Sequence, residues 1–538
     1  MLSRRSLLRG AAAAALLPSA ARVSAQAPVA ADWQSFVTSY RVPDWFRDAK
    51  FGLWSHWGPQ CVPEHGDWYG RQMYIQGNPF YRHHVATYGH PTQFGFIEFI
   101  GRWRAEVFEP QRLARLFRRA GARYLMSMAN HHDNFDNFDS AHHEWNALRV
   151  GPRRDLVGAW AQAARAEGLK FGVSNHSSHA WHWWQTAYGY DAEGPLRGRR
   201  YDAFRLRKSD GVGTWWEGLD PQELYTGPAF VPPDGIDSIA AMNAWHDARD
   251  GQWLEHAPPH NPAFVRKWLL RQIDLVEKYR PDIVYLDNYR LPFGRTGLEA
   301  VAHYYNQSLA WHGALDVVIT AKRLSHFQRR GIVEDVERGF LDGINPVPWQ
   351  TSTCIGQWHY DRGLYERRGY KPAKEVVQRL ADVVAKNGNL LLSIPQRGDG
   401  SIDELEEQIL EDLARWIAMN GDAIYGTRPW HRFGEGPTQL AAGFQNEGQG
   451  LHFTGADIRF TTKAGALNAI FLDWPEAEAT IASLGTSALP GARVEQVRLL
   501  GGPVLDFTRD GRGLHFRLPR PAAGAFVPAA RIEGRGLA

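Results

Sequence analysis

Polar residues that can do chemistry recur at the ends of short apolar runs. Each of these runs has the nearly continuous apolar character of a strand buried on both faces. The residues at their ends are His56, His131, His132, Asp133, His176, Asp287, Asn288, Lys322 and Arg323. In a parallel barrel the carboxyl ends of the strands meet at one mouth, where catalytic groups lie. The recurrence therefore predicts one active site assembled from several strands.

Two kinds of chemistry fit these residue types. Imidazoles bind zinc, and histidines are dense between positions 131 and 182. However, adjacent strand residues point to opposite faces, so His131 and His132 do not simply chelate one ion, and the sequence has no H-E-x-x-H spacing. Glycoside hydrolysis instead needs two carboxyl groups that face one sugar. The carboxyl candidates are Asp287 and, after the next strand, Glu334, Asp335 and Glu337.

The pattern along the chain predicts the elements that position these residues. Strands are expected at 50–56, 124–130, 170–176, 282–288, 316–323 and 388–394. Helices are expected at 110–120, 155–167, 263–279, 297–311, 374–386 and 403–419. This alternation predicts an α/β fold, a TIM-type (β/α)8-like barrel within residues 26–425. Because only six strands are evident, the barrel is expected to be irregular or the strand set incomplete.

Two further regions differ from the barrel pattern. Residues 185–261 are rich in Gly, Pro, Trp and Asp, and we interpret them as a long insertion over the barrel mouth. Its tryptophans, which are either sugar platforms or loop packing, are Trp215, Trp216, Trp245 and Trp253. Residues 426–538 show short alternating runs between glycine-rich turns, which predicts a C-terminal β-sandwich. Its expected strands include 451–453, 469–472, 497–500 and 514–518.

The first 25 residues are expected to be an export signal rather than part of the fold. A twin-arginine pattern at 3–8 precedes an Ala/Leu run and an A-x-A-like site ending at Ala25, which predicts periplasmic or secreted localisation in a bacterium. Cleavage removes four arginines and takes the formal charge from +3 to −1, so no basic surface for nucleic acid is expected. No later segment is long enough to span a membrane. The sequence does not decide whether Cys61 and Cys354 pair, or the oligomeric state.

Several motifs resemble the α-L-fucosidases of glycoside hydrolase family 29, in order from about residue 40 to 430. The opening motif is WFRDAKFGLWSHWG at 45–58, followed by DWY at 67–69. The second strand and its continuation read GARYLMSMANHHDNF at 121–135, WN at 145–146 and GPRRDLV at 151–157. The later matches are PWQ at 348–350, WHY at 358–360 and KNGNLLL at 386–392.

The resemblance implies an exo-acting, retaining α-L-fucosidase that acts on fucosylated oligosaccharides or glycoconjugates without a metal or cofactor. It implies Asp287 as nucleophile and Glu337 as acid/base, with Glu334 as the runner-up. Its implied sugar-binding residues are His56, Trp57, Asp67, Trp68, His131, His132, Tyr285 and Arg323. Arg323 is expected near Asp287, where a guanidinium helps to keep a carboxylate ionised.

Four positions depart from the family pattern. Asp67 replaces the more usual Glu, Gln350 replaces a Glu that follows Pro-Trp in many members, and Tyr285 replaces a Trp of some members. Residues 174–176 lack a Tyr that is common in the family. These departures affect the expected linkage and sugar more than the reaction class. Two alternatives therefore stay open, a retaining hydrolase of a related sugar and a decayed carbohydrate-binding protein.

Overall fold

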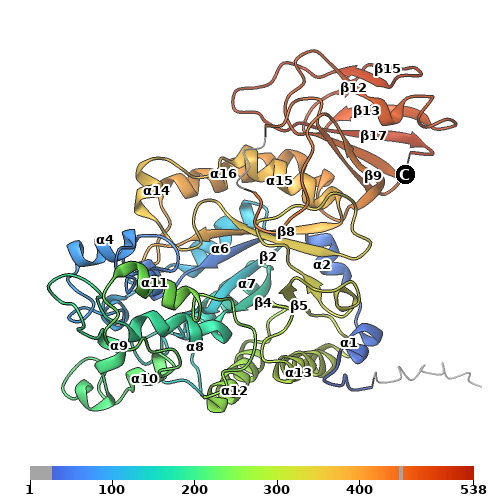
Figure 1. The fold of residues 1–538 in the computed structure, drawn as a ribbon. Helices are drawn as coiled ribbons and strands as arrows, with labels where there is room; N and C mark the ends of the chain where they lie inside the picture. The colour runs from blue at the N-terminus through green and yellow to red at the C-terminus, as the bar shows by residue number, and fades with distance from the viewer. Residues whose placement is uncertain (1–26, 448–451, 538) are drawn as a thin grey trace, which may run out of the picture.

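Eight parallel strands form the barrel in a computed structural model that describes residues 27–447 and 452–537. Figure 1 shows this sheet inside a layer of helices. The strands are β1 (Phe51–His56), β2 (Tyr124–Asn130), β3 (Lys170–Asn175), β4 (Ile283–Tyr289), β5 (Val318–Lys322), β6 (Val333–Glu334), β7 (Trp349–Cys354) and β8 (Gly388–Pro395). Neighbours along the chain pair in parallel, and β1 pairs with β8. A parallel bridge between Asp335 and Gln350 joins β6 to β7 and closes the barrel.

The predicted barrel is confirmed, and two of its strands were missed. All six expected strands are present with small shifts at their ends. β6 is only two residues long, too short to show a pattern. β7 carries Gln350, Ser352 and Thr353 instead of an apolar run, because these side chains join a buried polar network. Gln350 Nε2 and Ser352 Oγ donate to the Asp335 carboxylate, at 3.0 and 2.6 Å.

Of the six long helices that cover the described barrel, three begin at a residue whose side chain caps the first turn. The six helices are α6 (Pro110–Arg119), α7 (Leu156–Ala166), α12 (Pro262–Tyr279), α13 (Arg295–His312), α15 (Ala373–Ala385) and α16 (Glu404–Asn420). Asp155 caps α7 by accepting from the Gly158 N–H at 2.9 Å, and Asp403 and Glu406 form a capping box on α16. Only the short 3-10 turn η5 (Gln328–Arg330) follows β5. The barrel is therefore irregular on the side that carries β5 and β6.

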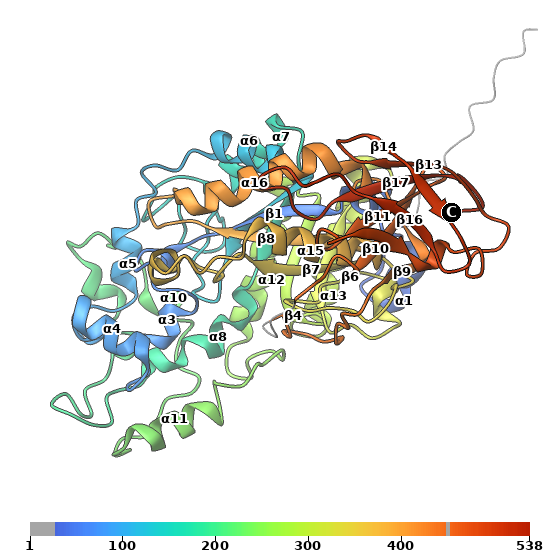
Figure 2. The ribbon, with the colours of Figure 1, turned by 90° about the horizontal axis from the view of Figure 1, so that it is seen from above.

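The region after β3 folds into short helices and packed loops. They are η2 (Ser177–His179), α8 (Ala180–Trp183), η3 (Trp184–Tyr188), α9 (Asp202–Arg205), η4 (Lys208–Gly211), α10 (Pro221–Leu224) and α11 (Ile239–Asp247). In Figure 2, α11 lies at the edge of the molecule, apart from α8 and from the shorter helices that follow β1. Those are η1 (Pro59–Cys61), α3 (Tyr69–Gln72), α4 (Pro79–Thr87) and α5 (Ile97–Arg102). A buried ion pair of 2.8 Å between Arg71 and Asp250 ties the two groups together.

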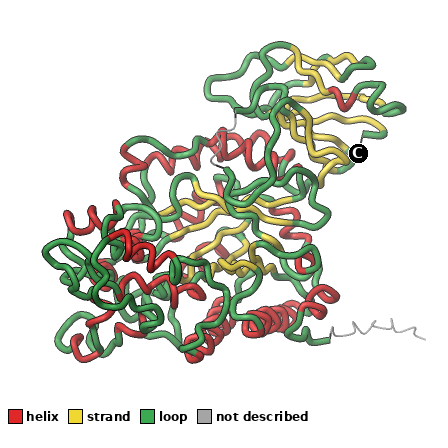
Figure 3. Tube along the Cα trace, in the orientation of Figure 1, coloured by secondary structure: helices red, strands yellow, loops and turns green. Residues whose placement is uncertain are grey.

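The C-terminal region contains two antiparallel sheets, which Figure 3 shows beside the barrel. The six-stranded sheet has β9 (Arg428–Glu435), β10 (Ile458–Lys463), β11 (Ala466–Phe471), β13 (Arg493–Leu499), β14 (Val504–Leu505) and β17 (Ala529–Arg535). The three-stranded sheet has β12 (Glu478–Ile481), β15 (Phe507–Arg509) and β16 (Leu514–Arg517). Phe471 and Phe516 meet across the shared core, which confirms the β-sandwich. A buried ion pair of 2.6 Å, Arg459 to Asp382, fastens it to α15.

Other predictions concern the N-terminal segment, one expected strand, the two cysteines and membrane-spanning helices. The signal segment 1–25 lies outside the described residues, as does Leu451 of the expected strand 451–453. His452 and Phe453 are described and are not in a strand, so that prediction was wrong for them. Cys61 and Cys354 are both buried as free thiols. Within residues 27–447 and 452–537, no helix combines the length and apolar character needed to cross a membrane.

Candidate active site

A cavity of about 330 Å³ opens at the carboxyl ends of the barrel strands. It is lined by Trp54, His56, Asp67, Trp68, His131, His132, His176, Trp253, Tyr285, Asp287, Tyr289, Lys322, Glu337, Arg338, Gln357, Trp358 and Gln445. These residues come from several strand ends, from the insertion and, in the case of Gln445, from the C-terminal region. The position agrees with the general placement of active sites in such barrels.

Asp287 lies near the end of β4 and is surrounded by cationic and imidazole groups. The Lys322 ammonium donates to its Oδ1, His176 Nδ1 lies 3.1 Å from its Oδ2, and His132 Nε2 lies 3.4 Å from the same oxygen. Burial alone would raise the pKa of Asp287, but Lys322 and then the two histidines hold this pKa well below its usual value. Asp287 is therefore a buried carboxylate that stays ionised.

Lys322 joins the two carboxyl candidates of the cavity. Its Nζ also donates to Glu337 Oε2 at 2.6 Å. Burial lowers the pKa of a lysine, yet Asp287 and Glu337 together raise the pKa of Lys322 well above its usual value. One ammonium ion therefore holds Asp287 and Glu337 on the same side of the cavity.

Four histidines line the cavity next to one another, and we call them the histidine wall: His56, His131, His132 and His176. His359, whose side chain is fully buried, contacts His56 and His131. Burial, and after it the neighbouring groups, lowers the pKa of His56 and His131 well below the usual value, so both imidazoles are neutral. A neutral imidazole offers one donor and one acceptor, which suits hydroxyl groups. Within the described residues, both ring nitrogens of His56 are buried without a hydrogen-bond partner.

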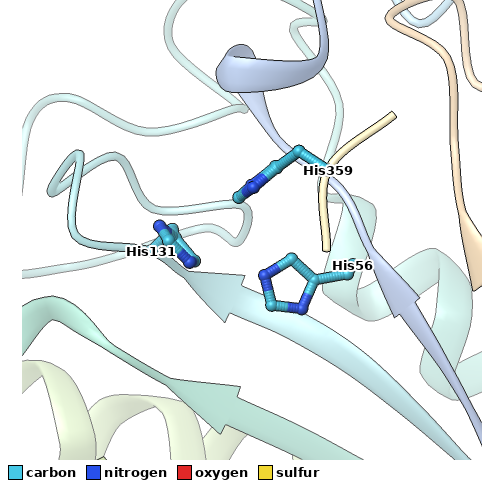
Figure 4. A group of neighbouring side chains, drawn as sticks. All are labelled: His56, His131 and His359. Atoms are coloured by element: carbon cyan, nitrogen blue, oxygen red, sulfur yellow. The ribbon is translucent and has the colours of Figure 1, made fainter. Parts of the chain in front are cut away.

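His56, His131 and His359 converge at the floor of the histidine wall (Figure 4), with one nitrogen of each within 4.8 Å of the others. His359 Nδ1 lies 2.6 Å from the Asp67 carboxylate, and His131 Nδ1 lies 2.9 Å from the Gln60 amide. Such a trio could hold a metal ion, because imidazole nitrogens are zinc ligands. The same nitrogens are also suited to hydroxyl groups of a polar ligand.

Aromatic side chains complete the cavity beside the polar groups. Trp68 adopts a left-handed backbone conformation, with φ of 60°, just before α3. Its ring lies edge to face with His132 at 5.6 Å and parallel to Trp253 at 6.2 Å. Trp54, buried at the base, contacts His56 and Tyr285. Flat indole faces beside neutral imidazoles match a ligand that has both C–H faces and hydroxyl groups.

The structure brings most of the predicted site residues into this cavity. Those that line it are His56, Asp67, Trp68, His131, His132, Tyr285, Asp287 and Glu337. Their expected roles as nucleophile, acid/base and sugar contacts stay predictions. Three other predicted residues lie elsewhere.

Trp57 and Arg323 each point away from the cavity, next to a neighbour that points into it. The Trp57 indole packs on Trp103 and Phe108 and donates to a backbone carbonyl, so it belongs to the core. Arg323 is exposed and stacks 4.3 Å over the Tyr289 ring. β5 ends at Lys322 and the backbone is left-handed at Arg323 (φ 50°), so Lys322 takes the position expected of Arg323 beside Asp287. The predicted placement in the site was therefore wrong for Trp57 and Arg323.

Glu334, the runner-up for acid/base, is held outside the cavity. It forms an ion pair of 2.7 Å with Arg329 and accepts from the Leu324 N–H at 3.0 Å. Of the two candidates for the acid/base, only Glu337, three residues later, lines the cavity. The geometry therefore favours Glu337 over Glu334.

Sequence reasoning missed some cavity residues and left others unassigned. His176 and Lys322 were noted at strand ends, Trp358 lies in a quoted motif, and Trp253 lies in the insertion. The main omission is Gln445, which is 108 residues from Glu337 along the chain. No motif marks Gln445, so only the packing of the C-terminal region shows its place.

Known proteins similar to this chain share both its sequence pattern and its fold. The model of the family described as Alpha-L-fucosidase matches residues 16–422. Tissue alpha-L-fucosidase of Rattus norvegicus is 26% identical, over 86% of this chain and 83% of that protein. Tissue alpha-L-fucosidase of Homo sapiens is also 26% identical, over 83% of this chain and 78% of that protein.

Solved structures give the same result for the fold. The crystal structure of Thermotoga maritima alpha-fucosidase covers 93% of this chain and 99% of its own, with 25% identity and a TM-score of 0.65. A structure of that enzyme in complex with fucose has a TM-score of 0.64 at 24% identity, over 94% of this chain and 100% of its own. Because the family model covers well over half of the residues, this chain belongs to the alpha-L-fucosidase family.

Proposed function

We propose that the protein is an exo-acting, retaining α-L-fucosidase that releases terminal L-fucose from fucosylated glycans. One observation carries the mechanistic part, namely that Lys322 contacts an oxygen of both Asp287 and Glu337 inside the cavity. Two oxygens on one nitrogen lie no more than about two hydrogen-bond lengths, roughly 5.5 Å, apart. A retaining glycosidase needs carboxyl groups about 5–5.5 Å apart, so the contact supports retention.

The two carboxyl groups take different roles in this proposal. The Asp287 carboxylate attacks the anomeric carbon while the bond from that carbon to the leaving oxygen breaks, and Glu337 gives its proton to that oxygen. Glu337 then removes a proton from water, the water oxygen attacks the anomeric carbon, and the bond to Asp287 breaks. The depressed pKa of Asp287 supports its role as nucleophile, because only the ionised form can attack.

The cavity supports recognition of a single terminal sugar. The histidine wall presents neutral imidazoles, and His56 has two buried nitrogens without partners in the described part of the chain. Buried polar atoms are nearly always paired, so a ligand with several hydroxyl groups fits here. Trp68 offers a flat face for the C–H side of the sugar. The fucose complex of the Thermotoga maritima enzyme supports fucose as that sugar.

One observation favours a second candidate, a retaining hydrolase of a related sugar. Asp67 stands where the family more often has Glu, and its carboxylate is engaged by His359 at 2.6 Å. Asp67 lines the cavity, but its side chain is shorter than that of Glu and is already bonded to His359, which changes the hydroxyl pattern that fits. Aryl α-L-fucoside and aryl galactosides, tested side by side, distinguish the two candidates by their kcat/KM values.

Three proteins test the proposal on an aryl α-L-fucoside, namely wild type, Asp287→Ala and Glu337→Ala. We expect turnover by wild type, loss of turnover in Asp287→Ala, and rescue of that variant by azide, which replaces the missing nucleophile. Undiminished turnover by Asp287→Ala would contradict the assignment of the nucleophile. No turnover by wild type on any aryl glycoside would favour a carbohydrate-binding protein instead.

We also propose that the protein acts outside the bacterial cytoplasm. The support is the twin-arginine pattern with Arg4 and Arg5, which precedes a cleavage-like site at Ala25. Fractionation of cells that express wild type should place a shortened chain in the periplasm or medium. An Arg4→Lys, Arg5→Lys double variant should stay in the cytoplasm at full length. Equal export of both proteins would overturn this assignment.

A further inference from the structure

A short segment of the C-terminal region, residues 443–447, lies against the part of the barrel that carries Glu337. Gly443 and Phe340 exchange two backbone hydrogen bonds of 3.0 and 3.2 Å, and the Gln445 N–H donates to the Glu337 carbonyl at 2.9 Å. The Glu447 N–H donates to the Arg338 carbonyl at 3.1 Å. Gly443 and Phe340 therefore form an isolated antiparallel bridge, and the turn that follows it donates two further backbone hydrogen bonds to residues 337 and 338.

The other edge of the Glu337 segment pairs with β7. The Val336 N–H donates to the Gln350 carbonyl and the Arg338 N–H to the Ser352 carbonyl, both at 2.8 Å. The segment thus lies between a barrel strand and residues 443–447. In the described residues, only turns and loops lead from the end of β6 at Glu334 to β7, so this part of the barrel has no helix of its own. Arg379 of α15 reaches the segment, and the C-terminal region covers its free edge.

Glu447 fixes this segment to the barrel. Its buried carboxylate pairs with Arg338 at 2.6 Å, Arg379 at 2.9 Å and Lys371 at 3.1 Å, and accepts from Thr353 Oγ1 at 2.7 Å. Burial would raise the pKa of Glu447, but Arg379, Lys371 and Arg338 lower it to about 2. A buried carboxylate with three cationic partners is costly to disrupt, so the position of the segment is well determined.

Gln445 reaches from this segment to the carboxyl group of Glu337. Its Nε2 donates to Glu337 Oε2 at 3.4 Å, the same oxygen that accepts from Lys322 at 2.6 Å. Gln445 also lines the cavity. Next to it, Phe444 packs edge to face on Tyr289 at 5.9 Å and under Arg323 at 4.8 Å. Side chains of the C-terminal region therefore form the cavity wall beside Glu337.

We propose that residues 443–447 are a working part of the active site, and that Gln445 is a positioning residue for the acid/base Glu337. This inference rests on the proposed function. Lys322 draws Oε2 toward Asp287, and the Gln445 amide holds the same oxygen from the opposite segment. Because both donors meet Oε2, Oε1 is the atom that carries the proton to the leaving oxygen.

The test compares leaving groups, because an acid matters most when the leaving group is poor. General acid catalysis contributes about 10²–10⁴-fold. For Gln445→Ala we expect kcat/KM to fall about 10–100-fold on a fucosyl disaccharide but less than about 3-fold on dinitrophenyl α-L-fucoside. The basic limb of the pH profile should also move. Gln408→Ala is the matched control, since Gln408 is an exposed glutamine of α16 that donates to Asp412 at 3.0 Å, and this variant should behave as wild type.

The outcomes separate this inference from the proposed function. An equal loss on both substrates, or no loss, would overturn the role of Gln445 while wild-type turnover stands. Absence of fucoside turnover in wild type would overturn both. Glu447→Gln should give the same leaving-group dependence as Gln445→Ala, because it loosens the segment. If Glu447→Gln does not fold, the Gln445→Ala result decides alone.

Discussion

The histidine wall of the cavity is built on barrel strands, whereas the wall around Glu337 is built on loops and on a segment of the C-terminal region. His56 ends β1, and His131, His132 and His176 directly follow β2 and β3. Glu337 follows a two-residue strand and is held by Lys322 and Gln445. Strand ends place side chains with little freedom, while loops need partners from elsewhere. The difference indicates that sugar binding is rigid and that the position of the acid is set by long-range contacts.

The largest expected effects come from removing the two carboxyl groups one at a time, because their variants should differ in how kcat/KM depends on the leaving group. Asp287→Gly should lower kcat/KM by about 10⁴-fold or more on every fucoside, because the attacking group is lost. Glu337→Gln should lower it about 10²–10⁴-fold on poor leaving groups and far less on dinitrophenyl fucoside. Steady-state kinetics on a series of aryl fucosides measure both effects. Equal sensitivity of the two variants to the leaving group would contradict the division of roles.

Lys322 contacts both carboxyl groups, so its removal should affect them together. Lys322→Met takes away the cation that holds the pKa of Asp287 down, and this pKa should rise. The nucleophile must be ionised, so the acid limb of the kcat/KM profile should move to higher pH, with a loss of about 10²-fold near neutrality. Lys322→Arg retains the charge and should keep the limb near its wild-type position. An unmoved acid limb in Lys322→Met would count against the ion pair.

Trp57 and Trp68 should give opposite results although both were expected to bind sugar. Trp57→Ala removes a buried core ring and should destabilise the fold by about 3–5 kcal/mol, with little change in KM for the protein that remains folded. Trp68→Ala removes an aromatic face of the cavity and should raise KM by about 3–10-fold with a small change in Tm. Thermal unfolding and steady-state kinetics check the pair. A raised KM in Trp57→Ala would place Trp57 in the site after all.

The histidine wall should make the folded protein less stable at acidic pH. We expect this effect to be smaller than those of the preceding variants. The folded pKa values of His56 and His131 lie below the unfolded value of about 6.5, so the unfolded chain binds protons first. Their contribution is complete above about pH 6.5 and is lost as the pH falls, by up to about 1.4 kcal/mol per histidine per pH unit. The Tm of His56→Asn should therefore fall less than the Tm of wild type when the pH is lowered from about 7.5 to about 5.5.

The pH dependence of Tm must be compared between wild type and His56→Asn, because Asp335 changes the stability in the opposite direction as the pH falls. Burial raises the pKa of Asp335 to about 7, so its contribution is lost as the pH rises through that value. Asp335 is present in both proteins and cancels in the difference. The exposed His312, at the end of α13, gives the matched control His312→Asn, which should follow wild type. If the Tm values of His56→Asn and wild type fell equally with pH, the assignment of neutral imidazoles to the histidine wall would be wrong.

The sequence predicts the regular parts of this molecule better than its polar exceptions. The six apolar strands and the capped helices are visible in the pattern, since burial on both faces and caps such as Asp155 leave local signals. β7 was missed because it carries polar residues in place of an apolar run, and two of them, Gln350 and Ser352, bind Asp335. Lys322 takes the place expected of Arg323 because β5 ends at Lys322 and the backbone turns at Arg323, which the sequence does not mark. Gln445 could not be found, because its place depends on how two regions pack.

The stereochemistry of the released sugar tests the central claim most directly. Wild-type enzyme should be mixed with an aryl α-L-fucoside in an NMR tube and the first-formed anomer observed before mutarotation. Double displacement by Asp287 and Glu337 predicts that α-L-fucose appears first. If β-L-fucose appears first, the reaction inverts, and the assignment of Asp287 as a covalent nucleophile is wrong.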